Sequence, residues 1–305
     1  MKDKKVVNFS VFLKEEIEKV EGVYYPVRAS FPRRLLIKQA GCMKLHPNTE
    51  DEFCFPEIGP NYSIISRYRQ EYKSDVHLLP GYDGGSVLEP LIVQKAMPDG
   101  YLILNGHHRW AAAILSGMRS VRIKIVNLTQ ETDIRKMLES SRSDRRVTLD
   151  LDEVVFCTEK DVFTEKPLRF PLNRFFRERV RKGTPALLHF FNEHNYDIWV
   201  YTSSYCSVEY IRYFFKHWNV RLTGIITGTA RKGGRAADTA REMKKLVETQ
   251  YRSTIHIDNQ ALIRTFSGSK KCEEYPLNGA PDTWAREVME IVRKLRPEAP
   301  ESGTV

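Results

Sequence analysis

The second half of the chain alternates short apolar segments with amphipathic ones. Apolar runs at 147–156, 196–204, 222–228 and 253–260 have the length of strands, and segments with helical spacing separate and follow them. Strands that alternate with helices form a parallel sheet covered by helices on both faces. We therefore expect an α/β unit over 147–305 with a doubly wound parallel sheet. In such sheets the ligand site lies outside the carboxyl ends of the strands.

Polar side chains stand where these strands end. We place Asp150 and Asp152, which lie inside the first apolar run, at the carboxyl end of the first strand, with Thr202 at the end of the second and Asp258 at the end of the last. Lys232 follows the third strand. A carboxylate can attack phosphorus, a second carboxylate can carry the proton, and Mg²⁺ prefers hard oxygen ligands. A lysine and a hydroxyl hold phosphate oxygens. The pattern therefore favours phosphoryl transfer at this edge.

The ordered set resembles the motifs of the haloacid dehalogenase (HAD) superfamily. The first motif, Asp-x-Asp-x-Thr/Val, is matched by residues 150–154, the second by Thr202, and the fourth by Asp258. For the third motif, a Lys or Arg upstream of the fourth, we choose Lys232. Three other basic residues compete for that place: Arg231, Lys244 and Lys245. Asn259 stands where the commoner fourth motif has a second acid, which still allows Mg²⁺.

The resemblance implies a Rossmann-like fold and a role for each matched residue. Asp150 is the nucleophile that becomes an aspartyl-phosphate, and Asp152 is the general acid and base. Thr202 and Lys232 hold the phosphoryl group, while Asp150, Asp152 and Asp258 form the Mg²⁺ site. Only 49 residues separate Asp152 from Thr202, so a large lid has no room. We expect a capless phosphatase for a bulky phosphorylated substrate: a nucleic-acid end, a nucleotide or a phosphoprotein.

The first half contains a second constellation of polar residues. Apolar β-formers flank a Pro98-Asp99-Gly100 turn signal, and Gly106-His107-His108-Arg109 then opens an alanine-rich helix closed by Gly117. Free amides at a helix N-terminus bind phosphate, and an added Arg and His strengthen such a site. Helix capping and packing by two ordinary histidines is the alternative reading of the pair.

Residues 89–93 and 106–109 resemble the ParB/sulfiredoxin fold, a small mixed α+β domain. His107 holds the place of the reactive cysteine of sulfiredoxins, so that chemistry is not expected. The Gly-His-His-Arg form is most similar to the nucleotide-dependent free-serine-kinase branch, although Asn105 replaces its usual Asp. The resemblance implies ATP or another nucleotide as cofactor, held by Gly106, His107, His108, Arg109 and Glu89.

Two questions stay open for this first constellation. The acidic residue that would serve it is one of four candidates: Glu50, Asp51, Glu52 and Glu89. The first half is either a kinase or nucleotidase, or a non-catalytic module that binds nucleotide or nucleic acid and recruits the phosphatase.

Length and composition set the outer limits. The 305 residues favour two domains, which we place at 1–128 and 147–305 with a charged linker at 129–146. The net charge of +9 is compatible with phosphate-rich partners, including nucleic acid. Five widely spaced cysteines indicate free thiols in a reducing cytoplasm. No apolar run approaches the ~18–20 residues that cross a bilayer, so we expect no membrane partner.

Overall fold

The chain folds into two compact units. The computed structural model describes residues 8–34, 36–78, 89–157, 163–229, 245–278 and 282–295. The first unit contains the described residues up to Leu128, together with Ser204–Val208 and 227–229. The second contains Thr129–Ser203, Glu209–Ile226 and the described residues from 245 onward.

The first unit is a mixed sheet with helices. Its elements are α1 (Phe9–Val20), β1 (Tyr25–Pro26), α2 (Phe31–Arg34), β2 (Lys38–Gly41), η1 (Cys42–Lys44), β3 (Leu45–His46), η2 (Glu52–Cys54), α3 (Tyr62–Leu78), β4 (Leu91–Met97), β5 (Tyr101–Asn105), α4 (His107–Leu115) and β6 (Ser120–Ile125). The strand order is β2-β6-β4-β5-β3, and β1 pairs with the far end of β4. The predicted strand, turn, strand and helix around the Pro-Asp-Gly signal are confirmed as β4, β5 and α4. The short strands β2 and β3 fall in segments for which no strand was predicted.

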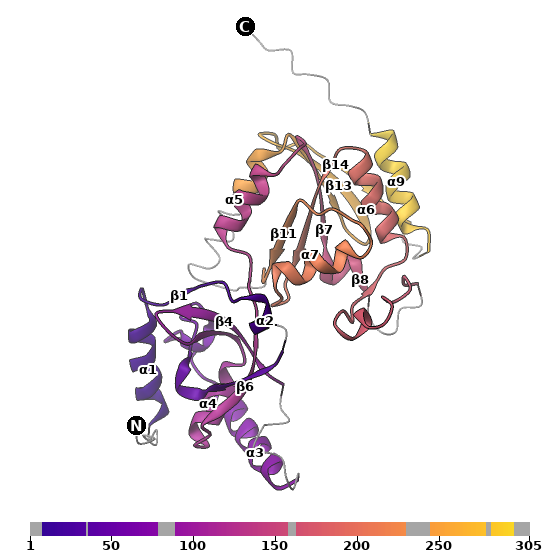
Figure 1. The fold of residues 1–305 in the computed structure, drawn as a ribbon. Helices are drawn as coiled ribbons and strands as arrows, with labels where there is room; N and C mark the ends of the chain where they lie inside the picture. Colours follow the sequence, from indigo (N-terminus) through magenta and orange to yellow (C-terminus); the bar gives the residue numbers. More distant parts are fainter. Residues whose placement is uncertain are drawn as a thin grey trace. The chain divides into compact units, whose positions relative to one another are not determined.

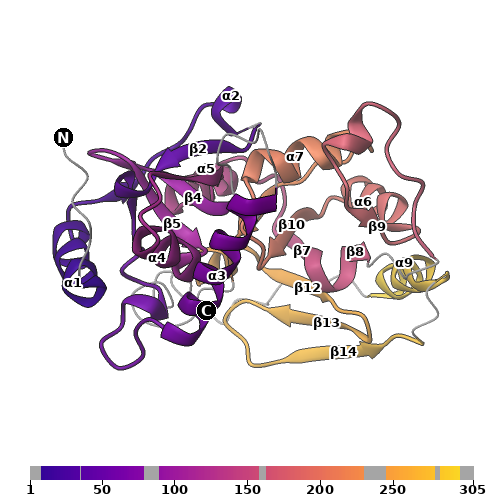
Figure 2. The same cartoon turned by 90° about the horizontal axis from the view of Figure 1, so that it is seen from below.

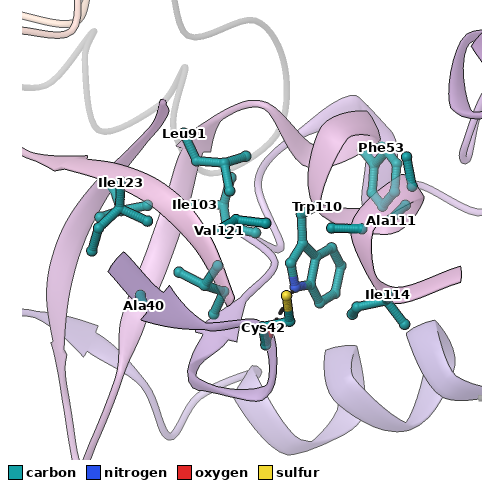
Figure 3. Close-up of a cluster of buried hydrophobic side chains, with 14 of the residues drawn as sticks. Ala40, Cys42, Phe53, Leu91, Ile103, Trp110, Ala111, Ile114, Val121 and Ile123 are labelled. Carbon is teal, nitrogen blue, oxygen red and sulfur yellow. Dashed lines mark hydrogen bonds between the residues drawn. The ribbon is translucent and has the colours of Figure 1, made fainter. Parts of the chain in front are cut away.

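Trp110 of α4 is the centre of the first unit's core. Its ring is fully buried and is approached by Phe9 and Phe12 of α1, each with ring centroids 6.0 Å away. The indole Nε1–H donates to the Cys42 carbonyl at 3.0 Å, so the polar end of the ring is satisfied inside the core. Figure 3 shows Cys42 and Ile114 on either side of this ring. This packing fixes α4, and therefore the helix N-terminus that carries the histidines.

The second unit holds a central sheet (Figures 1 and 2). Its elements are α5 (Glu131–Glu139), β7 (Arg145–Asp150), the π-helical turn η3 (Leu151–Val155), β8 (Phe156–Cys157), η4 (Leu172–Arg174), β9 (Arg179–Val180), α6 (Thr184–Glu193), β10 (Asp197–Thr202), α7 (Val208–Lys216), β11 (Gly224–Thr227), β12 (Ser253–Ile257), β13 (Ala261–Phe266), β14 (Cys272–Pro276) and α9 (Trp284–Lys294). Helices α6 and α9 pack against each other.

The sheet of the second unit is mixed, which corrects the prediction of a purely parallel one. Its order is β11-β10-β7-β12-β13-β14, and β7 is parallel to both β10 and β12. Strands β13 and β14 continue the sheet in antiparallel fashion. The Asp258 N–H donates to the Ala261 carbonyl at 3.0 Å, and this tight turn returns the chain beside β12 instead of sending it into a crossover helix. The α/β class holds, with an antiparallel edge.

The segment 129–146, predicted as a linker, is structured. It contains α5 and the first residues of β7, and both belong to the second unit. Ile134 and Met137 are buried one helical turn apart, and the Gln130 N–H donates to Asp133 Oδ2 at 2.9 Å in a capping box. Only two apolar side chains face the core in this polar segment, so its helical periodicity is too weak to predict the helix from the sequence.

Three other sequence predictions can be placed. The segment between the first two apolar runs, expected to be helical, forms η4 and β9 before the helix α6 begins. The five cysteines are free thiols. Within the described part of the chain, no helix combines the length and apolarity that a membrane span requires.

Candidate functional site

Strand register brings the predicted phosphatase residues to one edge of the second unit's sheet. Asp150 is the last residue of β7 and pairs with Tyr201 of β10, so Thr202 lies one position further along the same edge. Ile257 of β12 pairs with Leu149, which places Asp258 level with Asp150. Three neighbouring parallel strands therefore end in Asp150, Thr202 and Asp258. Three of the four candidates for the third motif, Lys232, Arg231 and Lys244, lie outside the described residues, and Lys245 is an exposed helical residue.

The turn after β7 fixes the carboxylate of Asp150. Its Oδ1 accepts the N–H groups of Asp152 and Glu153 at 2.7 and 3.0 Å, so Asp150 caps the π-helical turn that follows. Its Oδ2 has no hydrogen-bond partner among the described groups. One oxygen is thus held by the backbone, and the other is available for chemistry.

The Asp152 carboxylate accepts several hydrogen bonds from the end of the neighbouring strand β10. The buried Thr202 hydroxyl donates to both carboxylate oxygens, at 2.9 and 3.0 Å. The backbone N–H and hydroxyl of Ser203 each donate to Oδ2 at 2.6 Å. Ser203 was missed by sequence reasoning, although it directly follows Thr202. These bonds orient Asp152 toward the donors of β10, and its predicted role as a metal ligand stays a prediction.

A second polar group lies beside Asp258. The Nδ2 of Asn259 donates to the Glu153 carbonyl at 2.8 Å, and Arg181 donates to its Oδ1 at 2.6 Å. The Arg181 guanidinium also stacks on the Trp284 ring, 4.4 Å from its centroid. Asn259 therefore ties the strand end of β12 to the turn after Asp150. Arg181 was also missed, because nothing in its run of basic neighbours distinguishes it.

The carboxylates of Asp150 and Asp258 are of the ligand type that Mg²⁺ prefers, and Mg²⁺ binding by them stays a prediction. In the parts of the chain that the structure describes, no group of three His, Cys, Asp or Glu side chains could form a metal cage. Mg²⁺ does not need such a cage, because it keeps several waters and is commonly held by one or two carboxylates together with substrate phosphate. Two carboxylates on adjacent strand ends match that requirement.

In the first unit, Gly106 places the N-terminus of α4. Its φ of +103° lies in the left-handed region, and an added Cβ would stand 2.4 Å from Leu91 Cδ2. Only glycine fits there. The turn directs the first amides of α4 and the side chains of 107–109 beyond the end of β5.

The two histidines anchor the loop that leads to α3. His107 Nε2 accepts the Asn48 N–H at 3.2 Å, and His108 Nε2 accepts the Asn61 N–H at 3.1 Å. Phe53 stacks on His107, with ring centroids 5.3 Å apart. Both acceptor nitrogens must be unprotonated, so both rings are neutral in this arrangement. The structure therefore gives the pair a packing role; contact with a nucleotide stays a prediction.

Burial explains the acid–base behaviour of this pair. Desolvation lowers the pKa of His107 to about 4, with the Asp51 charge opposing the shift and His108 adding to it. Desolvation also lowers the pKa of the half-buried His108, again opposed by Asp51. Among the four acidic candidates, Asp51 is brought closest to the histidines, with Oδ2 3.5 Å from His107 Nδ1. Glu50 and Glu52 flank it in the same loop.

Arg109 ties two strands together. Its guanidinium donates to the Glu89 carbonyl at 2.6 Å and to Asn105 Oδ1 at 2.9 Å, and the residue is buried. The Glu89 carboxylate is 3.8 Å away and almost fully exposed. Arg109 thus secures the start of β4 and the end of β5, while Glu89 contributes mainly its backbone.

Comparison with known families supports the ParB/sulfiredoxin-like interpretation of the first unit. Residues 82–142 match the family described as ParB N-terminal domain, from before β4 to just beyond α5. The match includes the Gly-His-His-Arg segment. No curated protein matched the chain.

Proposed function

We propose that the second unit is a Mg²⁺-dependent phosphomonoester hydrolase and that the first unit binds nucleotide or nucleic acid. The main support for the enzyme proposal is the set of hydrogen bonds from Thr202 and Ser203 to the Asp152 carboxylate, two residues after Asp150. A carboxylate nucleophile, an oriented proton carrier and hydroxyl and amide donors then share one strand edge, the place where α/β sheets bind ligands. The HAD-like order of these residues along the chain supports the same reading.

In this reaction Oδ2 of Asp150 attacks phosphorus and the ester P–O bond breaks. Asp152 gives its proton to the departing alkoxide and then takes one from water, whose oxygen attacks the phosphorus of the aspartyl-phosphate. The P–O bond to Asp150 breaks, and inorganic phosphate leaves. Thr202 and Ser203 hold Asp152 before substrate arrives, and the same donors suit phosphoryl oxygens. Asp150 and Asp258 would hold Mg²⁺, which supplies positive charge against the phosphate.

A binding role for the first unit is favoured over a catalytic one. A ParB-like domain suggests nucleotide or nucleic-acid binding. The Nε2 atoms of both histidines accept backbone amides, and Asn105 replaces the acid of the kinase-like motif. A catalytic first unit is the alternative, and turnover of ATP or CTP by the full chain distinguishes the two.

The test of the phosphatase is hydrolysis of p-nitrophenyl phosphate by the full chain and by Asp150→Asn. The substitution keeps the volume of the side chain and both hydrogen bonds from the turn but removes the nucleophile. We expect a loss of at least about a thousandfold in kcat. Asp152→Asn should lose about a hundredfold or more, because proton transfer is impaired. Unchanged turnover by Asp150→Asn would refute the assignment.

A further inference from the structure

The segment that follows β8 and runs through β9 to Lys182 combines cations with exposed aromatic rings. Its described part, residues 163–182, holds seven Lys or Arg against two Glu. Within it, Phe163, Phe170 and Phe175 are 42%, 70% and 58% exposed. We call residues 163–182 the basic–aromatic loop. Single exposed apolar side chains are common, but three within one short cationic segment form a surface suited to contact.

The two acids of the loop are already engaged, whereas most of its cations are not. Glu165 Oε1 accepts the Gly183 N–H at 2.7 Å, and Glu178 Oε2 accepts the Tyr210 hydroxyl at 2.5 Å. Five exposed cations form no ion pair with any residue that the structure describes: Lys166, Arg169, Arg174, Arg177 and Lys182. The loop therefore presents an excess of positive charge to an outside partner.

The loop is ordered by its own contacts. Phe176 packs against α7, with ring centroids 5.0 Å from Tyr210 and 5.7 Å from Phe214. In both views the loop lies beside α7 (Figures 1 and 2). The Arg174 guanidinium lies over the Phe170 ring, 5.0 Å from its centroid. Packing of Phe176 thus holds the loop against α7. Because the loop is already ordered, it loses little conformational entropy when a ligand binds to its exposed rings.

The loop ends at the edge of the sheet that carries Asp150. The Arg181 N–H donates to the Val155 carbonyl, the last residue of the π-helical turn, at 2.8 Å. Its guanidinium reaches Asn259, the neighbour of Asp258. The loop is therefore joined at its Arg181 end to the turn after Asp150 and to the residue after Asp258.

We propose that the basic–aromatic loop binds single-stranded nucleic acid and presents its terminal phosphate to Asp150. Unpaired bases stack on aromatic rings while cations follow the phosphate backbone, which is the combination found here. A base-paired duplex hides its base faces, and the Asp and Glu side chains of an acidic peptide have no rings to stack. Presentation of the end rests on the proposed phosphatase function, whereas binding of the strand does not.

The experiment measures binding and catalysis separately in the full chain. Fluorescence anisotropy follows a fluorescein-labelled ten-residue oligothymidylate that lacks a terminal phosphate, so phosphatase chemistry plays no part. The variants are Phe170→Ala/Phe175→Ala and Arg169→Gln/Arg174→Gln. The matched control is Lys270→Gln/Arg286→Gln, which removes the same charge from exposed positions elsewhere in the second unit. Circular dichroism checks that each protein is folded, and hydrolysis of p-nitrophenyl phosphate measures catalysis separately.

The phenylalanine pair should weaken binding at least about tenfold. The arginine pair should lower the slope of log K against log salt by about 1.4, the value for two lost phosphate contacts on a single strand. The control should keep the wild-type slope, and p-nitrophenyl phosphate turnover should stay unchanged in all three.

Equal affinity of loop variants and wild type would overturn the proposal, and so would an equal loss in the control. Competition by poly-glutamate as strong as by oligonucleotide, with no effect of the phenylalanine pair, would assign the loop to acidic proteins instead and overturn it. If the wild type binds the oligonucleotide through the loop but hydrolyses no phosphomonoester, the phosphatase proposal fails while strand binding by the loop is supported.

Discussion

His107 should make the first unit unstable in mild acid. Burial lowers the pKa of its imidazole from 6.5 to about 4, and Nε2 must stay unprotonated to accept the Asn48 N–H. Below pH 6.5 the unfolded chain takes up a proton that the folded chain does not bind until about pH 4. Lower pH therefore favours unfolding, and stability rises with pH across this window.

The size of the effect follows from the shift in pKa. The change from 6.5 to about 4 corresponds to about 3 kcal/mol of unfolding free energy when the whole window is crossed. Between pH 7.5 and pH 5.0 the expected loss is about 2 kcal/mol. The variant His107→Gln keeps an acceptor near Asn48 but does not titrate, so this contribution should vanish in it.

The assay is urea unfolding of both proteins at the two pH values. Unfolding of the first unit should be followed by hydrogen exchange of peptides from 101–115. Tryptophan fluorescence would not isolate this unit, because both units contain tryptophans. Other titrating groups are common to both proteins and cancel in the comparison. The same loss of stability in wild type and His107→Gln would refute the reasoning, as would an NMR titration placing the His107 pKa near 6.5.

Three further predictions concern other parts of the molecule. Removing divalent metal with EDTA should abolish hydrolysis of p-nitrophenyl phosphate, and added Mg²⁺ should restore it; full activity in metal-free buffer would contradict the proposed use of Asp150 and Asp258. Arg109→Ala should destabilise the first unit by about 2–3 kcal/mol in denaturant titration, because it removes charge-assisted hydrogen bonds to two strands; unchanged stability would be incompatible with that role. Gly224→Ala should destabilise the second unit by about 3 kcal/mol or more, since its Cβ would stand 2.0 Å from Trp199 Cδ2, and an unchanged thermal unfolding midpoint would show that the packing is looser than described.

The sequence by itself determined the elements whose signals are local. The Pro98-Asp99-Gly100 turn, the strands on either side of it and the helix after Gly106 depend on residues within a few positions of one another. The φ angles of Gly100 and Gly106, +69° and +103°, are of the kind that glycine adopts without strain. The placement of Asp150 at a strand end was expected from the Asp-x-Asp motif and not from the apolar run, which continues to Phe156. These features required no knowledge of distant contacts.

The tertiary structure decided which groups these elements meet. Asp152 is held by Thr202 and Ser203, about 50 positions away along the chain, because the register of β7 and β10 aligns their ends. The histidine pair looked available for a ligand, but a loop 47 to 59 residues earlier supplies its hydrogen-bond partners. A polar side chain can form the same hydrogen bond with a ligand or with another part of the chain. A motif in the sequence therefore does not identify the partner. The tertiary structure does, because folding places a particular backbone group within hydrogen-bond distance of the side chain.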